Sequence, residues 1–137
     1  SPKDVATIYK NNYWDKIEGD LIKNQSIALM LYDAIVNQGS GATRSMVKNA
    51  LQEQKIPYDG IKASSINKAN QKKFYKSIYN QRLQRYEGGQ KEFREGWIKR
   101  LNDLSFVPTN RNKVIIISVS ILVLVGVSFY LIQKSKK

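Results

Sequence analysis

Residues 114–132 constrain this chain most, because these nineteen consecutive positions carry no charge and are almost all apolar. A helix of that length spans about 28 Å, which matches the hydrocarbon core of a bilayer. Phe129 and Tyr130 near one end are typical of an interfacial aromatic belt. A buried core helix is the alternative, but the polar, basic residues before it are too few to surround one. We therefore predict a linker over 105–112 with Pro108 in it, a transmembrane helix over 113–133 and a basic tail over 134–137.

The charge distribution predicts an orientation in the membrane. The chain has 23 basic and 11 acidic residues, a net charge of +12. Five basic residues flank the apolar run, and the other eighteen leave the body with a net charge of +7. Three flanking lysines follow the run, whereas two basic residues precede it, which favours a cytoplasmic C-terminus. We expect a single-pass cytoplasmic (inner) membrane protein, with its domain on the periplasmic or wall side.

Residue types that are missing exclude several kinds of site. The chain has no Cys, so it has neither a disulfide framework nor a thiolate nucleophile. It also has no His, which excludes Ser-His-Asp triads and most zinc sites. We expect no metal and no cofactor. A basic surface suits polyanions in general, but a membrane-tethered domain outside the cell rarely meets nucleic acid, so we expect no nucleic-acid partner.

Residues 1–104 show helical periodicity and no sustained strand alternation. Ser1-Pro2-Lys3-Asp4 is a helix start. We expect that helix to run to about Asn11, where Asn11-Asn12 loosens the chain. Further helices are predicted at 26–38, 43–54, 70–86 and 90–104, separated by Gly39-Ser40-Gly41, by a turn over 55–60 and by Glu87-Gly88-Gly89. The aromatic residues of helix 70–86 are expected in the core. Its basic residues are expected on the solvated face: Lys72, Lys73, Lys76, Arg82 and Arg85.

An aromatic corner stands out at Tyr13-Trp14-Asp15. Downstream, Asp33 and Asn37 lie four residues apart on one helix face, just before Gly39. Aromatic faces with nearby carboxylates and amides suit a sugar polymer, since rings stack on sugar faces and hydroxyls find donors and acceptors. The alternative interpretation is a buried aromatic corner with a polar residue that caps a neighbouring loop.

Five motifs in order resemble the C-terminal half of bacterial and phage N-acetylmuramidases of glycoside hydrolase family 108. They are Tyr13-Trp14-Asp15, Asp33-Ala34-x-x-Asn37-x-Gly39, Leu51-Gln52, Asp59-Gly60 and the helix Phe93-Arg94-Glu95-Gly96-Trp97-Ile98-Lys99-Arg100. The resemblance covers nearly all of residues 1–104. It implies a lysozyme-like helical bundle and a predicted peptidoglycan-binding domain. Tyr13, Trp14, Asp15, Asp33 and Asn37 are then the expected substrate-binding residues.

The same resemblance places the family's catalytic Glu in a Glu-Gly-Gly segment upstream of this chain, so Ser1 is expected to be a processed or truncated start. Glu87-Gly88-Gly89 spells the same letters, but two glycines after a helix form an ordinary helix stop. Glu18 and Asp20 flank the aromatic corner without an environment that would tune a general acid. We therefore expect no catalytic residue here. Ile61-Lys62-Ala63-Ser64-Ser65 also departs from the family's Gly-Pro loop.

Three functions follow for this all-α domain with its C-terminal transmembrane helix. The first is a membrane-anchored, endolysin-type module that recognises peptidoglycan, with peptidoglycan and the lipid bilayer as partners. The second is the C-terminal part of an active N-acetylmuramidase whose catalytic half is missing or lies on a separate partner chain. The third is a structural subunit of a membrane or virion assembly that keeps the fold without binding sugar.

Overall fold

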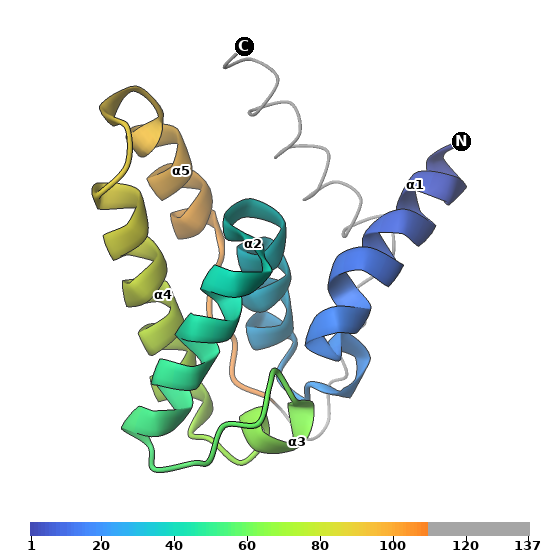
Figure 1. The fold of residues 1–137 in the computed structure, drawn as a ribbon, viewed down its shortest axis with the longest axis vertical. Coiled ribbons are helices and arrows are strands. Elements are labelled where there is room, and N and C mark those ends of the chain that lie inside the picture. The colour runs from blue at the N-terminus through green and yellow to red at the C-terminus, as the bar shows by residue number, and fades with distance from the viewer. Residues whose placement is uncertain (110–137) are drawn as a thin grey trace.

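The structure is a computed structural model that describes residues 1–109, and this part of the chain is helical without any strand. The predicted all-α class is therefore confirmed for it. Two long helices dominate, α2 and α4, and shorter ones surround them (Figure 1). The elements are α1 (Pro2–Tyr9), η1 (Lys10–Trp14), η2 (Asp15–Ile17), η3 (Gly19–Leu21), α2 (Gln25–Glu53), α3 (Ala63–Ile66), α4 (Gln71–Glu87) and α5 (Lys91–Asp103).

The first helix begins as the sequence predicts. The Ser1 hydroxyl accepts a hydrogen bond from the Asp4 amide, the Asp4 carboxylate reaches back to Ser1, and Pro2 occupies the first turn. The α-helix ends at Tyr9, slightly before the predicted end near Asn11, and at Asn11-Asn12 the chain continues as the wider π-helix η1. The widened turn of a π-helix rotates the residues that follow it, and here it brings Trp14 into the core.

Helix α2 is bent at Gly39, whose φ of 86° and ψ of 168° lie outside the helical region. This conformation suits glycine, since it carries no Cβ. The predicted helix end at Gly39 is confirmed. The predicted spacer after it is not, because the helix resumes directly at Ser40 and the Thr43 hydroxyl donates to the Gly39 carbonyl over 2.7 Å. The two halves of α2 therefore act as two packed helices joined without a loop.

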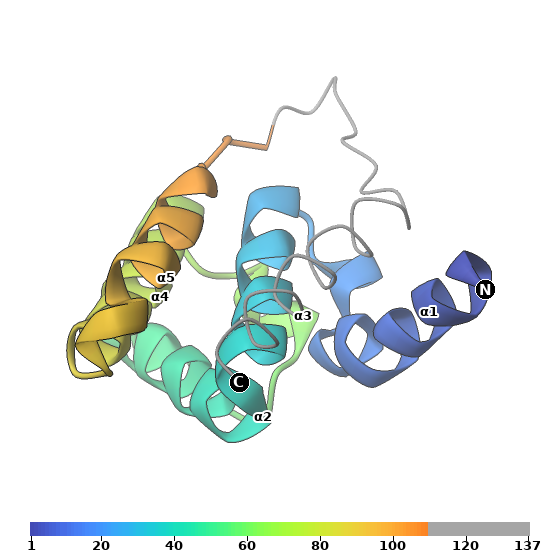
Figure 2. The ribbon, with the colours of Figure 1, turned by 90° about the horizontal axis from the view of Figure 1, so that it is seen from above.

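Helix α2 lies between α1 on one side and the α4–α5 pair on the other, as two perpendicular views show (Figures 1 and 2). The core forms where its apolar face meets α4 and the N-terminal turns. The aromatics of α4 lie mainly in it, as predicted, with Phe74, Tyr75 and Tyr86 buried. Other buried residues include Ile17, Ile22, Ile27, Leu31, Met46, Val47, Leu51, Ile66, Ile78 and Leu101.

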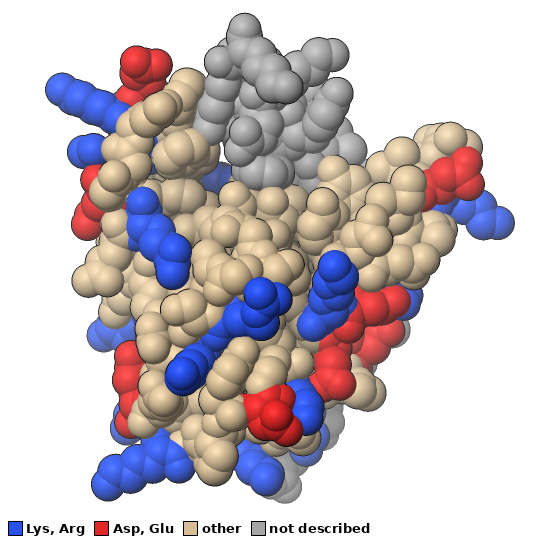
Figure 3. Space-filling view, viewed as in Figure 1, with Lys and Arg blue, Asp and Glu red and all other residues tan. Residues whose placement is uncertain are grey.

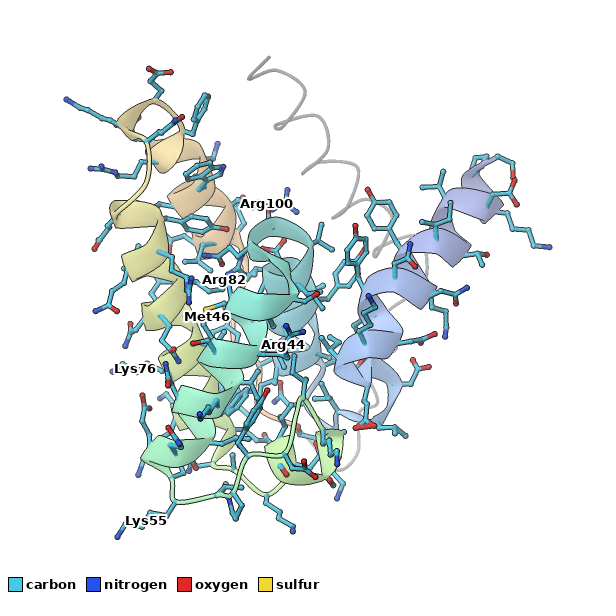
Figure 4. The ribbon with its side chains drawn as sticks, viewed as in Figure 1. Arg44, Met46, Lys55, Lys76, Arg82 and Arg100 are labelled. Carbon is cyan, nitrogen blue, oxygen red and sulfur yellow. The ribbon has the colours of Figure 1, made fainter. Side chains whose placement is uncertain are left out.

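Two predicted helix stops are confirmed. After α2 the chain turns through Lys55, which adopts a left-handed φ of 58° (labelled in Figure 4), and through Gly60 with φ 84°. At the C-terminal end of α4, the Gly88 amide donates a hydrogen bond to the Gln84 carbonyl. Between the two stops lies the short helix α3, at the position where the sequence departs from the Gly-Pro loop of the family that it resembles.

The segment after α5, which includes the described part of the predicted linker 105–112, contacts the domain. The Phe106 ring packs on Tyr75 at 5.4 Å. The Val107 amide donates to the Ser26 hydroxyl over 2.9 Å, and the Val107 carbonyl accepts from the Asn24 amide group over 2.9 Å. Within residues 1–109, no helix is long and apolar enough to cross a membrane. The predicted transmembrane helix 113–133 and tail 134–137 lie outside the described residues.

Candidate functional site

Trp14 is a core residue and not part of an open stacking surface. Its side chain is 3% exposed, and its ring meets Tyr32 edge-on at 5.9 Å. The indole N–H donates to the Asp20 carboxylate over 2.8 Å. Gly19 covers the indole so closely that an added Cβ would lie 2.2 Å from Trp14 Cε2. Burial therefore removes Trp14 from any surface that a sugar could reach in this structure.

The other two residues of the aromatic corner lie closer to solvent. Tyr13 is half-buried and packs against Tyr9, with ring centroids 5.4 Å apart. Asp15 is exposed, and its carboxylate accepts a hydrogen bond from Lys10 Nζ over 2.8 Å, which raises the pKa of that lysine. Ligand contact at Tyr13 and Asp15 stays a prediction.

Asp33 is buried, with 1% exposure, and holds two arginines. Its Oδ2 accepts from Arg82 Nη2 over 2.7 Å, and its Oδ1 accepts from Arg100 Nη2 over 2.9 Å. The predicted solvated position of Arg82 is wrong, because this side chain is fully buried. Figure 4 shows Arg82 on α4 where it faces α2. Asp33 thus joins α2 to α4 and α5, and it is not available to a ligand.

The Asp33 network satisfies most of the Arg82 donors. Arg82 Nε donates to Gln38 over 2.6 Å, and Nη2 also donates to the Tyr86 hydroxyl over 3.0 Å. Burial raises the pKa of Tyr86 despite the nearby positive charge of Arg82. Buried charges need such complete pairing, since an unpaired one would cost several kcal/mol. The network is therefore a structural element of the helix bundle.

Asn37 follows Asp33 by one helical turn, as predicted, but the two do not present a joint polar surface. The Asn37 amide group donates to the main-chain carbonyl of Asp33 over 3.0 Å. Its Oδ1 is buried and has no hydrogen-bond partner in residues 1–109. Of the five predicted binding residues, Tyr13, Asp15 and Asn37 keep some exposure, whereas Trp14 and Asp33 do not.

The carboxylates beside the aromatic corner have structural partners. Glu18 adopts a left-handed φ of 53° and accepts the Ala63 amide over 2.8 Å, so it caps the short helix α3. Asp20 holds the Trp14 indole. Glu87 is the last residue of α4, in the helix stop that the sequence predicts. Glycoside hydrolysis usually requires two carboxyl groups beside the scissile bond. Asp20 and Asp15 both lie beside Lys10, but within residues 1–109 these carboxylates are engaged in structural contacts.

A polar groove lies between the end of α2 and the length of α4. Its volume is about 470 Å³. Glu53 accepts a hydrogen bond from the Ser77 hydroxyl over 3.0 Å, and Gln81 donates to the Met46 carbonyl over 2.9 Å. Gln54 also exchanges two hydrogen bonds with the main chain of Asn70, so part of the groove lining is fixed. The lining residues are Glu53, Gln54, Lys73, Lys76, Ser77, Asn80, Gln81 and Gln84.

The groove is not among the sites predicted from the sequence, although its signal is present. Lys73, Lys76, Asn80 and Gln84 recur at intervals of three and four residues and so share one face of α4. The lysines alone predict only a solvated face. Amides interleaved with them at the same spacing would have indicated a face with both donors and acceptors. The part contributed by Glu53 could not be predicted, because it depends on how α2 meets α4.

Comparison with known proteins gives one match. The family model described as Glycosyl hydrolase 108 matches residues 1–39, from the start of α1 to the bend in α2. The matched stretch contains all five predicted binding residues, whereas the groove lies outside it. No curated protein and no solved structure matches the chain. The match supports a relationship between this chain and the glycoside hydrolase 108 family.

Proposed function

We propose that this chain recognises the glycan of peptidoglycan as a muramidase-type module and does not cleave it alone. The observation that carries the proposal is the family match over residues 1–39, the stretch that contains the first two of the five motifs. A family of glycoside hydrolases acts on sugar polymers. In residues 1–109 the carboxylates near the aromatic corner make structural contacts, which supports a binding role for such a domain.

The engaged carboxylates favour binding over hydrolysis. A general acid needs a carboxyl group with a raised pKa beside the scissile bond, and a second carboxylate nearby. Glu18 caps α3, Asp20 holds Trp14, and Asp33 is enclosed by two arginines. Each would have to abandon a structural contact to act on a substrate.

We place an extended glycan in the groove between α2 and α4. The exposed amide groups of Asn80 and Gln84 supply donors and acceptors for hydroxyl and N-acetyl groups. Lys73 and Lys76 supply positive charge for the carboxylates of lactyl groups and stem peptides. Tyr13 and Asp15 remain as a second, separate contact on the N-terminal arm.

The proposed module is held at a membrane by the apolar helix 113–133, with its domain on the wall side of the cytoplasmic membrane. Anchoring raises the local concentration of the domain near the wall, so that weak sugar contacts become effective. The apolar run and its flanking lysines support this part of the proposal.

The groove is tested by co-sedimentation of the full chain, in mild detergent, with purified insoluble peptidoglycan. The double variant Asn80→Ala/Gln84→Ala removes two amides from the groove without touching the core. We expect it to weaken binding about tenfold, as for the loss of one to two net hydrogen bonds. The matched control is Gln52→Ala/Gln90→Ala, which removes two exposed amides elsewhere. Equal binding by both variants would remove the groove from the proposal.

A further inference from the structure

One end of the domain combines exposed apolar and basic side chains. Leu21 is 64% exposed and Val107 is 45% exposed, which is unusual for large apolar residues in this domain. Both belong to the end at which the chain leaves the bundle after α5. Figure 1 shows the segment after α5 running down to the end where α3 and the start of α4 lie. Single exposed apolar residues are common on protein surfaces, but Leu21 and Val107 lie in segments that hydrogen bonds join to each other.

Hydrogen bonds join the segments of this end into one framework. The Asn67 amide group donates to the Leu21 carbonyl over 2.9 Å, and its Oδ1 accepts the Lys23 amide over 2.9 Å. Asn24, which is 2% exposed and caps α2, donates to Val107, to Thr109 and to Gln71. Leu21 and Val107 are therefore held at fixed positions relative to the start of α2.

Lysines surround the same framework. Lys23, Lys68 and Lys72 are all exposed. Lys68 follows Asn67 and Lys72 follows Gln71, so both adjoin residues that make these hydrogen bonds. The acidic side chains near this end are engaged elsewhere: Asp20 holds the Trp14 indole and faces Lys10 at 4.0 Å, and Glu18 accepts the Ala63 amide. We call Leu21, Lys23, Lys68, Lys72 and Val107 the exit face. Basic side chains also extend from the lower end of the molecule in Figure 3.

We infer that the exit face lies against an anionic phospholipid surface and sets the orientation of the domain. The inference rests on the membrane anchor of the proposed function. Thr109 is tied to Asn24, and Val114, the first residue of the apolar run, follows five positions later. Five extended residues reach at most about 17 Å, so an inserted helix would hold this end of the domain beside the headgroups.

The chemistry of the exit face suits that position. Apolar side chains such as Leu21 and Val107 enter the boundary between headgroups and acyl chains, and lysines pair with lipid phosphates. Each lysine near an anionic surface strengthens the contact about fivefold, so three together contribute on the order of 100-fold. The groove between α2 and α4 would then have a fixed direction relative to the membrane instead of turning freely on its anchor.

The test uses the full chain in vesicles, with fluorophores on single introduced cysteines, since the chain has none of its own. Leu21→Cys and Val107→Cys report on the exit face, and Gln90→Cys at the far end of α4 is the control. The quencher is a headgroup spin label in phosphatidylglycerol or phosphatidylcholine vesicles. We expect stronger quenching at 21 and 107 than at 90, and a larger difference with phosphatidylglycerol than with phosphatidylcholine, because the tether alone already keeps this end near the headgroups. Lys23→Gln/Lys68→Gln/Lys72→Gln should reduce the difference to the phosphatidylcholine level, whereas Lys16→Gln/Lys48→Gln/Lys99→Gln should not. Equal differences with both lipids would overturn the exit face.

Flotation of the vesicles separates a failure of the membrane anchor from a failure of the exit face. If the chain floats with them but positions 21, 107 and 90 are quenched equally, the exit face is wrong and the anchor stands. If the chain does not float at all, both the anchor and the exit face are overturned. Peptidoglycan binding by the groove is measured in detergent and does not depend on either result.

Discussion

Arg82 and Asp33 form an ion pair of 2.7 Å inside the helical domain, and both side chains are almost completely buried. The pair joins α4 to α2, and Arg100 adds α5 through the other carboxylate oxygen. Taking two charges out of water is costly, so such a pair is maintained only when further hydrogen bonds complete it. Gln38 and Tyr86 supply them here.

Removing Asp33 should destabilise the domain strongly. Asp33→Ala leaves the buried Arg82 guanidinium without its counterion, and we expect a loss of about 3–5 kcal/mol in the free energy of unfolding. Urea titration followed by circular dichroism measures it. Asp103→Ala removes an exposed carboxylate from α5 and should change stability by less than about 0.5 kcal/mol. A similar small change for Asp33→Ala would show that the network is dispensable.

Gly19→Ala tests the burial of Trp14. The added methyl group would come within 2.6 Å of three indole atoms, so the ring or the turn must shift. Overpacking of this kind costs about 1–3 kcal/mol. Gly41→Ala is the control, because an added Cβ there meets nothing within 4 Å. A lower melting temperature for Gly19→Ala alone, with a red-shifted tryptophan fluorescence, is expected. Equal stability of both variants would place Trp14 in a looser environment.

Stability should fall at alkaline pH because of buried tyrosines. Burial raises the pKa of Tyr75 to about 12, and burial also raises the pKa values of Tyr32 and Tyr86. Between pH 10 and 12 the unfolded chain has lost these protons while the folded chain keeps them. The stabilisation is therefore complete below pH 10 and is lost as the pH rises towards 12.

In Tyr75→Phe, the free energy of unfolding should fall less steeply between pH 10 and 12, by up to the contribution of one proton. The measurement is the slope of the free energy of unfolding against pH. The Tyr75 hydroxyl has no hydrogen-bond partner in residues 1–109, so we expect no loss of stability at pH 7. An unchanged slope would mean that the pKa of Tyr75 is the same in the folded and the unfolded chain.

Asn24→Ala should release the segment after α5. Its side chain caps α2 through the Ile27 amide and also holds Val107 and Thr109. We expect a loss of about 1–2 kcal/mol and faster hydrogen exchange at the Val107 amide. Ser26→Ala, which removes only the Val107 contact, should speed that exchange with a smaller loss of stability. Unchanged exchange in both variants would show that the segment is held mainly by Phe106.

The helices themselves could be predicted from the sequence, because their signals are local. Gly39 bends α2 for a reason of backbone conformation that needs no tertiary context. The position of the α4 end at Gly88 could also be predicted, although Gly88 itself has an ordinary helical φ of −78°. The Ser1 cap could be identified in the same way. The fixed segment 104–109 could not, since Asn24 and Val107 are 83 residues apart.

Arg82 shows why part of the site was missed. It lies four residues after Ile78 and four before Tyr86, so helical spacing alone places it on the buried face of α4. We gave more weight to its charge, because arginine is rarely buried without a partner. The partner, Asp33, is 49 residues away in the sequence, and its residue type also fits a ligand-binding role. The burial of Trp14 is equally hard to predict, because an aromatic residue beside a carboxylate is typical both of a sugar-binding site and of a core.

The central claim, binding of peptidoglycan without hydrolysis, is tested most directly by a single isotherm. Increasing amounts of purified insoluble peptidoglycan are added to the full chain in mild detergent, and the bound fraction and the release of reducing ends are measured together. We predict saturable binding that soluble peptidoglycan glycan fragments displace, with no reducing ends above the level of a protein-free control. Absence of saturable binding, or release of reducing ends by the chain alone, would contradict the account.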